Sequence, residues 1–365
     1  MSTRLTTSVP ASAPTAHPAK SGFDPNAAAA PDSGIFGLSS SSDDAGVVLI
    51  AAPWEATTSY RAGTAKGPEA ILAASRQVDL FDLDTGKPYE AGIALLPVPE
   101  SIASWATEAR QLAEPIIERG GVSDSDEDAV RNAARVNELS QQLNDWVYAT
   151  ARDHLQRGKL VGLVGGDHST PFGLIRAVAE KHPGMGILQL DAHADLRAAY
   201  EGFSDSHASI MYNVAERIPA VARIVQVGIR DFGEVEHEYA TARSGRIVQF
   251  HDSTLALKKA RGTPFAALCE EIAAALPKDV YLSFDIDGLD PTHCPNTGTP
   301  VPGGLTFQEA CLMVRTVVES GRRIVGLDVN EVAPGPGAGD EWDANVGARL
   351  LYKMIGWALR SRIAA

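Results

Sequence analysis

Short apolar runs alternate with helical stretches along most of the chain, and this alternation constrains the fold more than any other feature. Continuous apolar runs are typical of strands buried on both faces, and strands that alternate with helices form a parallel sheet. We therefore predict a three-layer αβα fold with a mainly parallel central sheet. The expected strands are 46–52, 159–164, 186–190, 223–228, 246–250, 279–284 and 323–328, and the expected helices are 171–180, 207–217, 264–275, 307–319 and 343–360.

The strand at 186–190 leads directly into Asp191-Ala192-His193-Ala194-Asp195. In an extended backbone, side chains alternate with period two, so Asp191, His193 and Asp195 are expected to point the same way from the strand end. Carboxylates and imidazole in this arrangement predict half of a metal site.

Two other strands end in the same way. The strand at 159–164 breaks at Gly165-Gly166 before His168, and the strand at 280–284 is followed by Asp285 and Asp287. Ligands of parallel sheets bind beyond the carboxyl ends of the strands, so the three ends are expected to converge. Two imidazoles and four carboxylates are too many for one zinc ion and suit two hard or borderline divalent ions. Such a centre would favour a cationic substrate.

The composition narrows the functional classes. Of the 365 residues, 44% are hydrophobic and 21% are charged, as in a soluble enzyme, and the net charge is −14. This charge argues against binding to nucleic acid or to an anionic membrane surface. Three cysteines without CxxC spacing argue against a disulfide framework and favour the reducing cytoplasm. We identify no apolar run of the roughly 18 residues that a membrane span needs, and no apolar core of a signal peptide.

The chain is predicted to hold one catalytic domain, residues 46–365, after a low-complexity extension, residues 1–45. The extension is rich in Ala, Ser, Pro and Thr, which is typical of disorder. Its apolar residues Phe23, Ile35-Phe36 and Leu38 suggest the alternative that it docks on the body or on a neighbouring subunit. Within the domain, residues 100–158 are expected to be helical with a break at Gly120-Gly121, and an acidic run is expected to begin the second helix.

Three segments together resemble the signatures of the ureohydrolase family, which includes arginase, agmatinase and guanidine hydrolase. They are Gly165-Gly166-Asp167-His168-Ser169, Asp191-Ala192-His193-Ala194-Asp195 and the run from Ser283 to Pro291. The resemblance covers roughly residues 46–361 and implies an arginase-like fold with two metal ions, Mn²⁺ or Ni²⁺. It implies that one ion is bound by His168, Asp191, Asp195 and Asp285, and the other by Asp191, His193, Asp285 and Asp287, with Asp191 and Asp285 bridging.

The same resemblance suggests a reaction and further site residues. Hydroxide supplied by the metal centre would attack the guanidinium carbon and release urea, and Asp195 would also hold the nucleophile. His207 matches the family's proposed proton shuttle, Glu331 the carboxylate that pairs with guanidinium, and Thr299 a hydroxyl on the substrate side. His207 has a structural alternative as a residue that packs at a helix start, and Asp167 and Asp290 are expected to brace the site rather than bind metal.

The substrate is predicted from weaker signals. Residues 195–208 resemble agmatinases, whereas residues 342–347 and the long N-terminal extension resemble the guanidine hydrolase branch. If Trp54 and Trp342 wall off the site, the substrate is guanidine or a small N-alkylguanidine rather than agmatine. The family is commonly trimeric or hexameric. Agmatinase activity stays open, as does a mainly structural subunit of a hetero-oligomer, while a deacetylase would need one zinc and fewer carboxylates.

Overall fold

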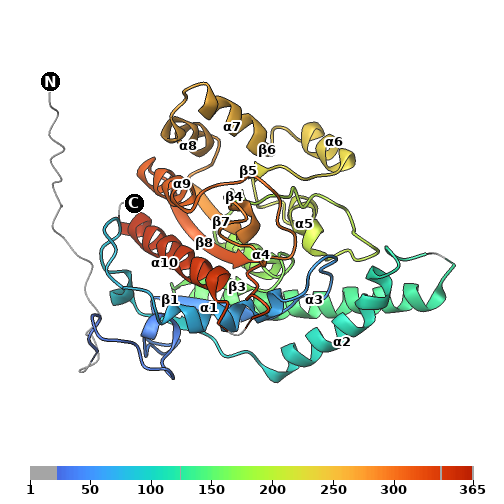
Figure 1. The fold of residues 1–365 in the computed structure, drawn as a ribbon, viewed down its shortest axis with the longest axis horizontal. Helices are drawn as coiled ribbons and strands as arrows, with labels where there is room; N and C mark the ends of the chain where they lie inside the picture. The colour runs from blue at the N-terminus through green and yellow to red at the C-terminus, as the bar shows by residue number, and fades with distance from the viewer. Residues whose placement is uncertain (1–22, 124, 338, 364–365) are drawn as a thin grey trace.

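An eight-stranded parallel sheet runs through the middle of the molecule (Figure 1). The computed structural model describes residues 23–123, 125–337 and 339–363. The strand order is β2-β1-β3-β8-β7-β4-β5-β6, and every neighbouring pair is parallel. The strands are β1 (Val47–Ala52), β2 (Ile93–Leu95), β3 (Leu160–Gly165), β4 (Gly186–Leu190), β5 (Arg223–Ile229), β6 (Ile247–His251), β7 (Asp279–Asp285) and β8 (Arg323–Asn330).

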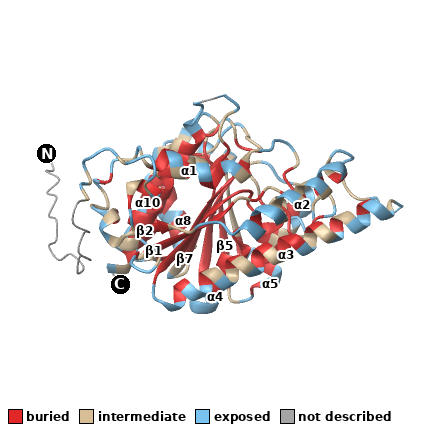
Figure 2. Cartoon of the chain, turned by 90° about the horizontal axis from the view of Figure 1, so that it is seen from below, coloured by how far each residue is buried: buried red, intermediate tan, exposed pale blue. Residues whose placement is uncertain are grey.

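Helices cover both faces of this sheet, which confirms the predicted three-layer αβα class (Figure 2). Alternate strand residues pack into two separate apolar cores: Leu188 and Leu190 of β4 face one, and Ile187 faces the other. The first core is covered by α1 (Gly67–Ser75), α7 (Asp252–Ala260), α8 (Phe265–Ala274), α9 (Phe307–Glu319) and α10 (Trp342–Ile363). The second is covered by α2 (Glu100–Ile117), α3 (Glu127–Gln156), α4 (Phe172–Lys181), α5 (Ile210–Arg217) and α6 (Glu234–Ala242).

Most elements lie where the sequence predicts them. Strand 186–190 and helix 307–319 have the predicted bounds, and the others differ by a few residues. Some elements were not predicted. Among them, β2 is too short to show a pattern, and α6 and α7 each bury few residues of their own. Among the described residues, we find no helix that is both long and apolar enough to span a membrane.

Two predicted helix starts are confirmed by their caps. The carboxylate of Asp126 accepts a hydrogen bond of 3.0 Å from the backbone N–H of Ala129, so the acidic run does begin α3. Thr306 and Glu309 form a reciprocal capping box at the start of α9. Both caps are formed by residues a few positions apart, which is why the sequence alone predicts where these two helices start.

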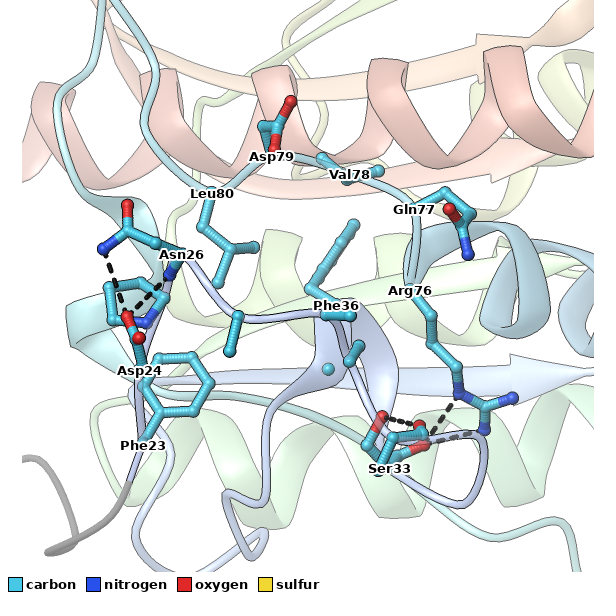
Figure 3. A pocket seen from close by; sticks show the side chains of 16 residues that line it. Phe23, Asp24, Asn26, Ser33, Phe36, Arg76, Gln77, Val78, Asp79 and Leu80 are labelled. Carbon is cyan, nitrogen blue, oxygen red and sulfur yellow. Dashed lines mark hydrogen bonds between the residues drawn. The ribbon is translucent and has the colours of Figure 1, made fainter.

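The described part of the N-terminal extension docks on the body of the same chain (Figure 3). Ile35, Phe36 and Leu38 are buried in the core that α1 and α10 cover, and the Phe36 ring lies 4.8 Å from that of Tyr352. The Arg76 guanidinium donates two hydrogen bonds to the Ser33 carbonyl. The docking alternative is therefore correct for residues 23–38, whereas residues 1–22 lie outside the described residues. The domain boundary near residue 45 stays a prediction.

Candidate metal centre

The metal-type residues lie where β3, β4 and β7 end. These strands lie in the order β3-β8-β7-β4 and run parallel, so their carboxyl ends lie along one edge of the sheet. The backbone is tightly packed there. A Cβ at Gly166 would lie 1.8 Å from the Trp54 carbonyl oxygen, and one at Gly288 would lie 2.6 Å from the Asp191 nitrogen. Glycine at both positions therefore lets the strand ends approach each other closely.

The first cluster surrounds the imidazole of His168. Its Nδ1 lies 3.0 Å from Asp191 Oδ2, 3.1 Å from Asp195 Oδ2 and 3.3 Å from Asp285 Oδ2. Ligand atoms of His168, Asp191 and Asp285 lie close enough together to hold one ion. On the other side of the ring, Nε2 lies 2.9 Å from the Ser283 hydroxyl, which donates to Asp328. This contact orients Nδ1 toward the carboxylates.

The second cluster consists of Asp191, His193 and Asp287. His193 Nδ1 lies 3.0 Å from Asp287 Oδ2 and 3.7 Å from Asp191 Oδ1. Asp191 therefore contributes one oxygen to each cluster. Asp285 belongs only to the first three-residue group, and its Oδ1 accepts the backbone N–H of Asp287 at 2.9 Å.

The charges in the two clusters suit divalent cations. Burial and the Asp191 charge raise the pKa of Asp195 to about 7, and burial with the Asp287 and Asp191 charges raises the pKa of Asp285. Although burial favours the protonated form of Asp191, contacts with the two histidines lower its pKa. His168 Nδ1 is buried and has no hydrogen-bond partner among the described residues, although three carboxylates surround it. A lone pair aimed into a carboxylate cluster fits metal coordination.

Two of the predicted site residues have a strained backbone. Asp195 (φ 53°) and Glu331 (φ 61°) adopt the left-handed conformation, which is uncommon for residues other than glycine. The Asp195 carbonyl accepts the backbone N–H groups of Met211 and Tyr212, and the Glu331 N–H donates to the Gly166 carbonyl. Strain maintained by surrounding hydrogen bonds is typical of functional sites.

Glu331, His207 and Thr299 lie around the clusters. The Glu331 carboxylate is buried and accepts the backbone N–H of His168 at 3.0 Å; burial and the Asp167 charge raise its pKa. Burial and nearby positive charges lower the pKa of His207 to about 3, and its Nδ1 lies 3.3 Å from Thr57 Oγ1. The Thr299 hydroxyl donates to Asp287 Oδ2 at 3.4 Å.

These residues border a cavity of about 170 Å³ above the clusters. Its lining includes the predicted residues His168, His193, Asp195, His207, Asp285, Thr299 and Glu331. A larger cavity of about 400 Å³ lies under the docked N-terminal segment and contains none of these seven residues (Figure 3).

The two tryptophans that were predicted to close off the site, Trp54 and Trp342, do not line the smaller cavity. Trp54 is fully buried in the core under α2 to α6. Trp342 is 49% exposed and its indole N–H donates to the Thr292 carbonyl. Neither is among the residues that line the smaller cavity. Its outer part is instead lined by residues that include Arg197, Tyr200 and Asp231, for which the sequence analysis predicted no role. The signal was available, because Arg197 follows the metal-type residue Asp195 by only two positions.

Comparisons with known proteins agree with this geometry. The model of the Arginase family matches residues 45–356. The N(1)-aminopropylagmatine ureohydrolase of Thermus thermophilus is 33% identical over 317 residues, which cover 86% of this chain and 90% of that protein. The guanidinobutyrase of Pseudomonas aeruginosa is 31% identical over 315 residues, 84% of each chain. The solved agmatine ureohydrolase of Thermoplasma volcanium has the same fold, with a TM-score of 0.68 at 22% identity over 89% of this chain and 94% of its own. The chain belongs to the arginase family of ureohydrolases.

Proposed function

We propose that this protein is a binuclear-metal hydrolase that cleaves a guanidino C–N bond and releases urea plus ammonia or an amine. The substrate that we propose is guanidine or a small N-alkylguanidine. The observation that carries this proposal is the pair of His/Asp clusters that share Asp191 beneath a cavity bordered by the buried carboxylate of Glu331.

Six residues would hold the two divalent ions, and they offer two imidazoles and four carboxylates: His168, Asp191, His193, Asp195, Asp285 and Asp287. Two such ions would supply Lewis-acid polarisation and an activated water as nucleophile. Imidazole and carboxylate suit both Mn²⁺ and Ni²⁺, so we propose one of these two metals.

The surrounding side chains suit the rest of the reaction. Glu331 would pair with the planar guanidinium cation. Burial alone favours the protonated carboxyl group, and the ion pair with the substrate would stabilise the charged carboxylate instead. His207 borders the cavity and would pass a proton to the leaving nitrogen, the role that the family resemblance implies for it. In the overall reaction, water adds to the guanidinium carbon, the C–N bond to the leaving nitrogen breaks, and that nitrogen departs protonated as ammonium or alkylammonium.

The outer part of the cavity supports a short substrate. The guanidinium of Arg197 lies 4.9 Å from the centre of the Tyr200 ring, and its Nε lies 3.4 Å from the buried carboxylate of Glu236. Stacking and ion pairing therefore hold a resident cation beside the cavity entrance. A substrate with a second positive charge at its far end would bring that charge close to Arg197 and be repelled, whereas guanidine has no second charge.

Agmatine hydrolysis is the second candidate function. Asp231 also lines the cavity, and its side chain is 69% exposed and 4.0 Å from His193 Nε2. An exposed carboxylate at this point suits a distal ammonium group. Relatives that include the N(1)-aminopropylagmatine ureohydrolase and agmatinases also act on long, cationic substrates by name.

We further propose a cytoplasmic homo-oligomer, a trimer or hexamer, in which the isolated chain is active. A hetero-oligomer with a mainly structural role for this chain is the alternative. Light scattering of the purified protein gives the number of subunits, and the activity and metal content of the same fraction distinguish these two alternatives. An active homo-oligomer supports the proposal, and an inactive chain that loads two metals supports a partner subunit.

Urea release tests the proposed reaction. The purified chain is loaded in parallel with Mn²⁺ or Ni²⁺ and assayed against guanidine, methylguanidine, agmatine and arginine. We expect the highest kcat/KM for guanidine or methylguanidine. A preference for agmatine would assign the protein to the agmatinases, and no urea from any substrate despite two bound metals would overturn the proposal that the isolated chain catalyses this reaction.

Arg197 offers a sharper test of substrate length. The variant Arg197→Ser removes the resident cation and leaves the Glu236 carboxylate beside the cavity, so we expect the ratio of kcat/KM for agmatine over guanidine to rise about tenfold. Arg261→Ser is the matched control, because it removes the same charge from the end of α7, outside the cavity lining. An unchanged ratio in Arg197→Ser would exclude Arg197 as a determinant of substrate length.

A further inference from the structure

Three glutamines lie at matching positions in three neighbouring strands that are mainly apolar. Gln189 lies in β4, Gln226 in β5 and Gln249 in β6, and the strand register pairs Gln189 with Gln226 and Gln226 with Gln249. Gln189 and Gln226 have no exposed surface, and Gln249 is partly buried. All three alternate with residues of the core under α1, α8 and α10, so they share the opposite face of the sheet.

The side-chain amides form a chain of hydrogen bonds that runs across the sheet. Gln249 Nε2 donates to Gln226 Oε1 at 2.8 Å, and Gln226 Nε2 donates to Gln189 Oε1 at 2.6 Å. Gln189 Nε2 then donates to Asp191 Oδ2 at 2.7 Å. Gln226 and Gln189 therefore each accept from one neighbour and donate to the next, and the hydrogen-bond chain ends on a carboxylate, where a donor is bound most strongly.

The second hydrogens of the buried amides reach the backbone of the same segment. Gln189 Nε2 also lies 3.4 Å from the His193 carbonyl, and Gln226 Nε2 lies 2.6 Å from the Ala194 carbonyl. These two carbonyls directly precede the left-handed backbone of Asp195. The two amides thus contact three residues of the segment that leaves the sheet, Asp191, His193 and Ala194.

Strand pairing does not require these side chains, because the backbones of β4, β5 and β6 are already paired with one another. Buried amides are also less favourable than leucine or valine unless every polar atom has a partner. Their arrangement is explained by what they hold at the end of β4.

We infer that Gln189 and Gln226 are positioning residues, which hold Asp191 and the backbone carbonyls of His193 and Ala194 in the arrangement that binding of two divalent ions requires. Gln249 supports them from the edge of the sheet. This inference rests on the proposed metal centre, and it assigns to buried glutamines the role of outer partners that fix metal-binding side chains.

The test replaces the amide without changing the length of the side chain. Gln189→Met keeps an unbranched side chain of similar length in the core but removes the donor to Asp191 and the acceptor for Gln226. We expect Mn²⁺ binding by the full-length protein, measured by isothermal titration calorimetry, to weaken about 10- to 100-fold for at least one of two ions. Gln249→Met is the matched control at the far end of the hydrogen-bond chain, and we expect its Mn²⁺ affinity to change by less than about threefold.

Each outcome separates positioning from packing. If Gln189 only fills space, Gln189→Met binds both ions as tightly as the wild type, and the inference is overturned. Equal weakening in Gln189→Met and Gln249→Met would also overturn it, because the effect would then not depend on contact with Asp191. If Gln189→Met does not fold, Gln226→Met takes its place, because it removes the hydrogen bond to the Ala194 carbonyl. We then expect Gln226→Met to bind Mn²⁺ more weakly than the wild type, and an unchanged affinity would overturn the inference. A wild type that binds neither Mn²⁺ nor Ni²⁺ would overturn the proposed metal centre itself.

Discussion

Replacing Asp191 with asparagine is expected to lower urea release by roughly 10³-fold or more and to abolish tight binding of both metal ions. Asp191 belongs to both His/Asp clusters, so the loss of its charge affects two ions at once. Asparagine has the same shape, and its oxygen can still accept the backbone N–H of His193, which Asp191 Oδ1 accepts at 2.7 Å. The fold is therefore expected to persist. Metal content and urea release are measured on the same sample, with thermal unfolding as the check on folding.

Asp290→Asn is the matched control for this variant. Asp290 lies in the same signature as Asp285 and Asp287, but its carboxylate braces the loop by accepting the N–H and hydroxyl of Thr292. We expect two bound ions and activity within about threefold of the wild type. Two tightly bound ions in Asp191→Asn would contradict the shared role of Asp191.

Glu331→Gln is expected to lower kcat/KM by about 10²- to 10³-fold while both metal ions stay bound. The glutamine keeps an oxygen for the backbone N–H of His168, so the nearby metal ligand stays in place. The variant removes the one buried negative charge that we propose to pair with guanidinium. Steady-state kinetics with each guanidino substrate and metal analysis of the same preparation check this result.

The control for Glu331→Gln is the same substitution at a carboxylate far from the centre. Glu309 caps α9 and pairs with Lys259, and it is not part of the cavity lining. Glu309→Gln is expected to lower stability slightly and to leave kcat/KM within about threefold. If Glu331→Gln loses its metals as well, Glu331 acts on the metal centre rather than on the substrate.

Local sequence patterns predicted most of the secondary structure because they depend on neighbouring residues. The apolar runs that became β3, β4 and β7, and the caps of α3 and α9, are properties of a few consecutive residues. The elements that the sequence missed lack such a pattern. The weakly buried α6 and α7 are examples: α6 packs against β6, and α7 packs against β5 and β6.

The candidate site was predicted in part for the same reason. Period-two alternation and the common edge of a parallel sheet indicate which residue types meet, as for His168 and Asp191, but not which atoms. The distances that make Asp191 the shared residue follow from the order of β3, β8, β7 and β4.

The sequence by itself determined the fold class, the strand ends and the chemical character of the candidate metal site. Only the tertiary structure decided which side chains surround that site. It placed Trp54 in the core, Arg197 and Tyr200 beside the cavity entrance, and a row of glutamines behind Asp191. The physical reason is distance along the chain: His207 and Thr57 lie within 3.3 Å although 150 positions separate them, and no local pattern encodes such a contact.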